Sequence, residues 1–151
     1  MSNPSVTLNG PWDHAQVERF LSDTVYPLRL ACIGPDEFPR VVSLWFKYAA
    51  GRLHCVTHKS SKLMGLIQAS PRVGFEVSTN DPPYFGVRGQ GLVTISPVDA
   101  TQMLDELLER YLDDANTTLQ QWLRSRAADE RIIEIEPTRF FSWDYRARMN
   151  D

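Results

Sequence analysis

Apolar and polar residues alternate along much of the chain, and this pattern predicts β-strands. Apolar residues alternate with others at 28–32 and 53–56, and strands are expected at 28–32, 53–57, 72–78 and 85–95. Residues 40–48 are rich in Val, Trp and Phe and predict one long strand that is buried on at least one face. Closing strands are expected at 131–136 and 139–144, with a break at Pro137. Turn residues at 34–36 and 49–52 predict hairpins between neighbouring strands.

Helical periodicity appears in four segments. Apolar stripes predict helices at 12–22 and 62–68 and, after the cap-like Ser96-Pro97, a helix that carries Leu104, Leu107, Leu108 and Tyr111 on one face. A further helix is expected at 117–128. Most strands follow one another through hairpins and do not alternate with helices. We therefore expect an α+β fold, a six-stranded antiparallel barrel with peripheral helices.

Composition limits the class of protein. The 151 residues suit a single domain over 1–151, and the net charge of −3 without a basic block argues against binding nucleic acid. The longest uncharged apolar run, 41–46, is too short to cross a membrane, and the N-terminus has no signal-peptide pattern. Cys32 and Cys55 lie in expected strands and are interpreted as reduced core residues, so a cytoplasmic location is expected.

The segment 56–62 carries the most suggestive chemistry. It reads Val-Thr-His-Lys-Ser-Ser-Lys and joins the end of an expected strand to the start of a helix. A helix N-terminus leaves N–H groups without partners and favours negative charge, and hydroxyl and ammonium groups add charge-assisted hydrogen bonds. We expect a phosphate here. The alternative is that Ser60 or Ser61 only caps the helix while the lysines are solvated.

Other sequence patterns give weaker indications of function. His54 and His58 do not share a face and have no third partner, so no metal ligand is assigned, and no catalytic side chain stands out. Trp45 and Tyr84 have rings that could stack on a flat cofactor or simply fill the core. Three glycines within 85–95 predict a bulge or the close approach of another backbone or of a ligand.

Taken together, four motifs resemble the pyridoxamine 5′-phosphate oxidase-like, FMN-binding split-barrel family. They are 39–46 (PRVVSLWF), Thr57 with Ser61-Lys62, 71–73 (PRV), and Pro82-Pro83-Tyr84 before 87–89 (VRG). The resemblance implies a split barrel that forms a homodimer, with flavin at the subunit interface and a small-molecule substrate. It assigns FMN contacts to Arg40, Val41, Val42, Ser43, Trp45, Val56, Thr57, His58, Lys59, Ser61, Lys62 and Tyr84.

The chain also departs from that family. The true oxidase has a lysine where this chain has Trp45, a basic residue in place of Leu63, and a glutamine in place of Tyr84. Its C-terminal arginine-and-histidine motif has no clear match in 139–151. The resemblance therefore implies an FMN-dependent oxidoreductase of unknown substrate rather than an enzyme of vitamin B6 oxidation. The alternatives are a deazaflavin-dependent reductase and a carrier or sensor that binds flavin or haem without turnover.

Overall fold

The computed structural model describes residues 6–149, which form eight β-strands, five α-helices and two short 3-10 helices. The strands are β1 (Thr7–Asn9), β2 (Leu28–Ile33), β3 (Pro39–Leu44), β4 (Lys47–Ala49), β5 (Arg52–His58), β6 (Arg72–Ser78), β7 (Phe85–Ile95) and β8 (Glu130–Asp144). The helices are α1 (His14–Asp23), α2 (Lys62–Ala69), α3 (Thr101–Tyr111), η1 (Asp114–Asn116), α4 (Thr117–Ser125), η2 (Ala127–Asp129) and α5 (Arg146–Met149).

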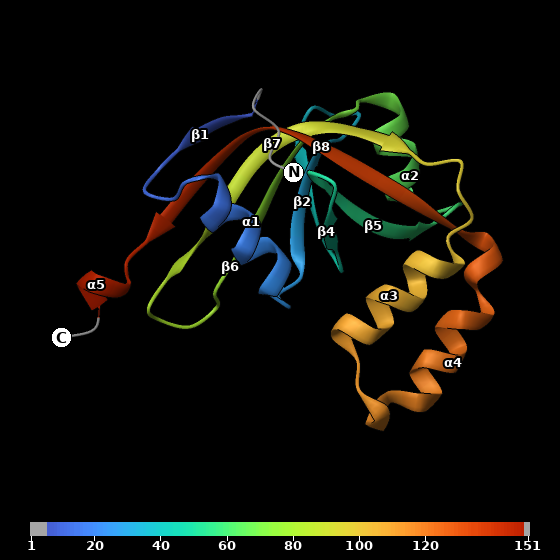
Figure 1. Cartoon of the computed structure of the whole chain (residues 1–151). Helices are drawn as coiled ribbons and strands as arrows, with labels where there is room; N and C mark the ends of the chain where they lie inside the picture. The colour runs from blue at the N-terminus through green and yellow to red at the C-terminus, as the bar shows by residue number, and fades with distance from the viewer. Residues whose placement is uncertain (1–5, 150–151) are drawn as a thin grey trace.

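All eight strands belong to one sheet with the order β3-β2-β6-β7-β8-β5-β4, and β1 pairs with β8. The pairs along this path are antiparallel, whereas β1 runs parallel to β8. The two ends of the path, β3 and β4, are joined by only Trp45-Phe46. Because three Cα steps span at most about 11 Å, the sheet must curl until its two ends meet. The curled sheet is visible in Figure 1.

The barrel closes at one place and stays open beside it. The ladder between β4 and β5 begins where Ala49 pairs with Arg52 and ends where Lys47 pairs with His54. On the other side of the opening, β3 pairs with β2. Beyond Lys47 the ladder between β4 and β5 ends, so β3 and the second half of β5 border an opening, which we call the split. The expected class, an α+β antiparallel split barrel with peripheral helices, is confirmed, with eight strands instead of six.

Alternating side chains fill the barrel interior. Leu28, Leu30 and Cys32 point inward from β2, and Leu53 and Cys55 do so from β5. The two cysteines are free and buried, as predicted. Full burial raises the pKa of the Cys55 thiol to about 12, so this group packs as a small apolar side chain and is not a nucleophile.

Two strand predictions were wrong. The strand expected over 40–48 is two strands, because the chain leaves β2 at Leu44 and joins β5 at Lys47. The break expected at Pro137 does not occur, and β8 runs through it. Pro137 lies opposite the bulge at Gln90/Gly91, between the part of β8 that pairs with β5 and the part that pairs with β1. Its missing N–H therefore falls where β8 changes partners.

Helix boundaries also shifted. The helix expected to begin at Ser96-Pro97 begins at Thr101, and the Ser96 hydroxyl instead accepts a hydrogen bond from the Val98 N–H at 3.2 Å. The first helix begins at His14 behind an Asp13 cap, and the helix expected over 117–128 ends at Ser125. The short elements β1 and α5 had no counterpart in the sequence analysis.

The helix pair α3–α4 stands beside the barrel, and α5 ends the described chain on the opposite side (Figure 1). Arg110 of α3 connects this pair to the N-terminal helix. Its guanidinium donates to the carbonyl oxygens of Leu21, Ser22 and Thr24 at the C-terminus of α1, where the helix dipole favours a cation. Within residues 6–149, no helix is both long enough and apolar enough to cross a membrane.

Candidate functional site

The split meets the N-terminus of α2, because α2 follows β5 after a three-residue turn. Thr57 at the end of β5 donates from Oγ1 to Ser61 Oγ at 2.9 Å, and Ser61 Oγ accepts from the Met64 N–H at 3.1 Å. Ser61 is thus the helix cap that the alternative interpretation proposed. Its hydroxyl hydrogen remains available to donate to an anion, so the capping role and the anion-binding role are compatible.

The two lysines of the segment differ in their surroundings. The Lys59 ammonium lies 2.8 Å from an Asp129 carboxylate oxygen, and the Lys59 N–H donates to the Asp129 carbonyl at 2.8 Å. This ion pair joins the end of β5 to η2, and the Lys59 side chain holds the pKa of Asp129 below its usual range. Lys62 is the first residue of α2 and is exposed at its N-terminus. Lys62 is therefore the better placed cation for an anion bound there.

His58 organises the turn. Its Nδ1 accepts from the Ser60 N–H at 3.1 Å and lies 2.8 Å from the Ser60 hydroxyl, while its carbonyl accepts from the Ser61 N–H. The His58 ring and carbonyl thus satisfy the N–H groups of Ser60 and Ser61 and fix the turn between β5 and α2.

Residues predicted separately on β3 and β5 come together at the closed end of the split. Ser43, Trp45 and Val56 line one pocket of about 240 Å³, whose other walls include Leu104 and Leu107 of α3. On the side of β5 away from β8, no ladder pairs form at Val56, because the ladder with β4 stops at His54. Backbone N–H and C=O groups on this edge are open to hydrogen bonds from a ligand.

Tyr111, which was predicted only to lie on an apolar helix face, holds the two residues Trp45 and Phe46 that join β3 to β4. Its ring stacks on Trp45, and its hydroxyl accepts from the Phe46 N–H at 3.3 Å and donates to the Tyr26 carbonyl at 3.1 Å. Burial raises the pKa of Tyr111, so the hydroxyl stays protonated. A tyrosine within an amphipathic helix gave no signal of this role.

Arg40 is not directed at the cradle formed by Thr57, Ser61 and Lys62. It lies near the start of β3, where its guanidinium pairs with Asp36 at 2.9 Å and donates to the Phe38 carbonyl at 2.9 Å. This contact lowers the pKa of Asp36 and raises that of Arg40. Of its neighbours, Val42 packs against the core and Val41 is exposed on the outer face of the sheet.

Tyr84 lies far from the cradle of its own chain. It precedes Phe85, which pairs with Asp144 at one end of β8, whereas Thr57 pairs with Arg131 near the other end. The strand path between Arg131 and Asp144 is about 40 Å. Figure 1 shows the loop between β6 and β7 and the end of β5 on opposite sides of the molecule. One flavin could contact both Tyr84 and the cradle only if they came from different chains.

A larger cavity than that of the split, about 590 Å³, lies on the outer face of β2, β6 and β7. Ala31 and Gly74 pair across β2 and β6 at its centre, and the apolar side chains of Ile33 and Leu92 border it and are exposed. The sequence analysis missed this surface. The alternation of Ala31, Ile33 and Val41 with inward residues was the signal that could have revealed it.

The donor set of the split fits a phosphate ester. It combines the Ser61 hydroxyl, which Thr57 orients by donating to it, the exposed Lys62 ammonium group and the N–H groups of Lys62 and Leu63, which Ser61 does not satisfy. Residues 6–149 contain no group of three or more His, Cys, Asp or Glu side chains placed to hold a metal ion.

No family model and no curated protein matches the chain. Solved structures do match it. A conserved hypothetical protein of Mycobacterium tuberculosis has a TM-score of 0.74 at 21% identity, with 97% of this chain and 91% of that chain covered. An F420 reductase has a TM-score of 0.68 at 26% identity, covering 86% and 97%. A candidate pyridoxamine 5′-phosphate oxidase of Listeria innocua has 0.64 at 12%, covering 83% and 94%. The chain therefore has the fold of the pyridoxamine 5′-phosphate oxidase-like split barrels.

Proposed function

We propose that the protein is an FMN-dependent oxidoreductase that acts on a small molecule, with the flavin phosphate bound between Thr57, Ser61 and Lys62. The observation that carries this proposal is the position of Lys62, an exposed cation beside a hydroxyl pair at a helix N-terminus, at the mouth of the split. The flavin would supply the electron transfer. The chain's own groups would bind the phosphate, orient the ring along the open edge of β5 and exclude water with α3.

A second copy of the chain would complete the site. Tyr84 lies beside the C-terminal end of β8, whereas its own chain's cradle lies beside the other end of that strand. The exposed apolar side chains of Ile33, Val41 and Leu92 lie on the outer face of the sheet, around the small residues Ala31 and Gly74. Small residues at the centre of an apolar sheet face allow another sheet to pack closely, so we propose that the two-fold contact of the dimer forms there.

A deazaflavin is the second candidate cofactor, and the similarity to an F420 reductase at 26% identity favours it. Both cofactors carry a phosphate, so the cradle does not distinguish them. The absorption spectrum and mass of the ligand released from purified protein will separate the two. Reduction of the bound cofactor by NADH or NADPH, followed by reoxidation with an added acceptor, tests for turnover. The free, buried cysteines are compatible with a reducing compartment, and this supports our proposal of a cytoplasmic location.

The test of the cradle compares its two lysines by titration of apoprotein with FMN. Lys62→Ala should raise the dissociation constant about 10- to 150-fold, because a charge-assisted contact is worth roughly 1.5–3 kcal/mol. Lys59→Ala is the matched control, since this lysine is paired with Asp129, and its constant should stay within about threefold of the original. Equal affinities of the original protein and both variants for FMN would show that the phosphate does not bind at this segment.

A further inference from the structure

Another cavity, of about 300 Å³, lies between α1 and the C-terminal end of β8 and shares no residue with the split. Its lining consists of an aromatic floor and a polar rim. The floor is formed by Trp12, Phe20 and Phe85, and the rim includes Arg19, Asp23 and Arg146. The volume is at the lower end of the range for ligand pockets and suits a molecule with a single ring.

The three rings of the floor contact one another in tilted or edge-to-face arrangements and are not stacked in parallel. The Trp12 centroid lies 5.1 Å from that of Phe20 and 6.3 Å from that of Phe85, with interplanar angles of 50° and 60°. Phe20 and Phe85 meet at 5.9 Å and 70°. Tilted rings at these distances form a concave apolar surface, against which a flat ring can pack edge-to-face or offset.

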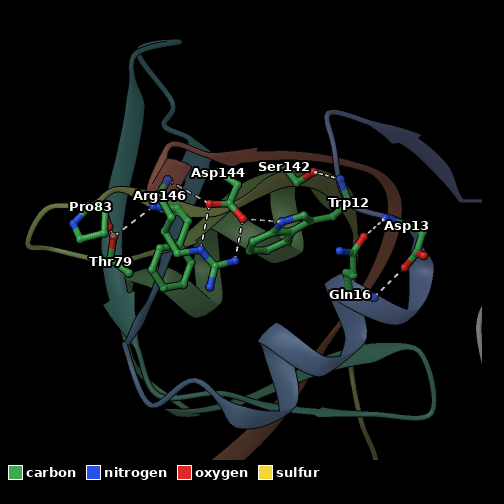
Figure 2. A network of polar contacts seen from close by, with 9 residues as sticks. Trp12, Asp13, Gln16, Thr79, Pro83, Ser142, Asp144 and Arg146 are labelled. Atoms are coloured by element: carbon green, nitrogen blue, oxygen red, sulfur yellow. Dashed lines mark hydrogen bonds and ion pairs between the residues drawn. The ribbon is translucent and has the colours of Figure 1, made fainter. Parts of the chain in front are cut away.

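Hydrogen bonds hold this arrangement without a ligand. The Trp12 indole N–H donates to Asp144 Oδ2 at 3.1 Å, and Arg146 donates to the same carboxylate from Nε at 2.9 Å and Nη2 at 2.6 Å. Figure 2 shows the Trp12 indole and the Arg146 guanidinium both directed at the Asp144 carboxylate. Asp144 is thus saturated by groups of the protein and is not the group that meets a ligand.

The arginines of the rim still have donors to offer. The Arg146 guanidinium lies 4.2 Å from the Phe85 ring centroid, and its Nη1 is the nitrogen that Asp144 does not use. Arg19 is exposed one turn before Asp23 on α1 and also lines the cavity. Planar guanidinium groups recognise carboxylates through paired N–H donors. Asp23 is the one acidic side chain of the lining, so donors outnumber acceptors at the rim.

We propose that this cavity binds a small aromatic carboxylate, with the ring on the floor of Trp12, Phe20 and Phe85 and the carboxylate between Arg19 and Arg146. The site does not depend on the flavin cradle, because it shares no lining residue with the split. Titration of the cradle variants with FMN and titration of this cavity with benzoate therefore test the two assignments separately.

The test uses three probes with the same phenyl ring and different charge in ¹H–¹⁵N NMR titrations at constant ionic strength: benzoate, benzamide and benzylamine. Benzoate should bind at least tenfold more tightly than the neutral and cationic probes. It should shift the indole N–H signal of Trp12 but not that of Trp122, which is exposed on α4. Equal binding of the three probes, tighter binding of benzylamine, or no shift at Trp12 would each overturn the proposal.

Variants then assign the carboxylate contact. Arg19→Gln should weaken benzoate binding at least tenfold and leave benzamide binding unchanged, and because Arg19 is exposed the fold should be kept. Arg124→Gln is the matched control, since that arginine is exposed on α4 and paired with Asp105, and it should bind benzoate like the original protein. Unchanged benzoate affinity in the Arg19 variant would also overturn the proposal.

Discussion

The indole ring of Trp45 lies parallel to the phenol ring of Tyr111, with 8° between their planes and 5.3 Å between their centroids. One face of Trp45 is therefore covered by α3, at the point where the chain crosses from β3 to β4. A flavin in the split can meet Trp45 only by its other face or its edge. The residue that replaces the oxidase family's lysine thus belongs to the closure of the barrel as well as to the wall of the split pocket.

Removal of the Tyr111 hydroxyl should destabilise this closure. In Tyr111→Phe the ring stack is kept, but the buried Phe46 N–H and the Tyr26 carbonyl lose their partner. We expect the free energy of unfolding in urea to fall by about 1–3 kcal/mol. Tyr145→Phe, on an exposed ring, is the control and should change it by less than about 0.5 kcal/mol. A Tyr111 variant as stable as that control would show that the hydroxyl bridge contributes nothing.

Two glycines should respond to alanine in opposite directions. A Cβ at Gly89 would collide with the Arg139 carbonyl oxygen and the Phe75 ring, whereas a Cβ at Gly65, in the middle of α2, would meet no atom within 4 Å. Gly89→Ala should lower the melting temperature by several degrees, because backbone must move. Gly65→Ala should stabilise the protein by about 0.5–1 kcal/mol through helix propensity. Similar melting temperatures for the two variants would contradict this account of β7.

Acid should weaken the Asp144 network. The hydrogen bond from Arg146, with smaller help from Trp12, lowers the pKa of Asp144 from 3.8 to about 2. Because the folded value lies below the unfolded one, this stabilisation is complete above about pH 4 and is lost as the pH falls toward 2. The contribution should be about 1 kcal/mol, since the pair is partly exposed to solvent. The difference in free energy of unfolding between the original protein and Asp144→Asn should shrink as the pH falls from about 4 to 2. A difference that does not change with pH would contradict this role of the ionised Asp144.

A charge on the outer sheet face should separate the proposed dimer. Ile33→Asp places a carboxylate beside Ala31 and Gly74, where desolvation in an interface would be costly. Sedimentation should show a dimer for the original protein and a monomer for the variant, with weakened FMN binding. Val98→Asp, at an exposed apolar position in the loop before α3, is the control and should remain dimeric. A monomeric original protein that binds one FMN per chain would refute the shared site.

Local patterns predicted most elements because local physics determines them. The strand 72–78 and the start of α2 at Lys62 were predicted correctly, since period-two alternation and a serine cap do not need distant partners. The glycines of β7 were also interpreted correctly, as they mark a bulge and a close backbone approach.

The predictions were wrong where contacts between residues far apart in the sequence determine the local structure. Residues 45–46 have the composition of a strand, yet the curl of the sheet makes them a corner. Pro137 breaks a ladder only where its N–H is needed, and that depends on which strand lies beside it. For the site, the sequence identified Thr57 and Ser61 as neighbours but could not show that Asp129 binds Lys59, because these residues are 70 positions apart and meet only through pairing of β5 with β8.

The last strand also determines when the molecule can become complete. β8 pairs with β7, β5 and β1, and Ser142 accepts a hydrogen bond from the Trp12 N–H across 130 positions. During synthesis, β1 therefore has no edge to join until residues 139–141 have left the ribosome. Contacts of such long sequence separation slow folding, and unpaired edges of β5 and β7 stay exposed in the meantime. A nascent chain stalled before Glu130 should thus be a chaperone client, even though the finished barrel hides both edges.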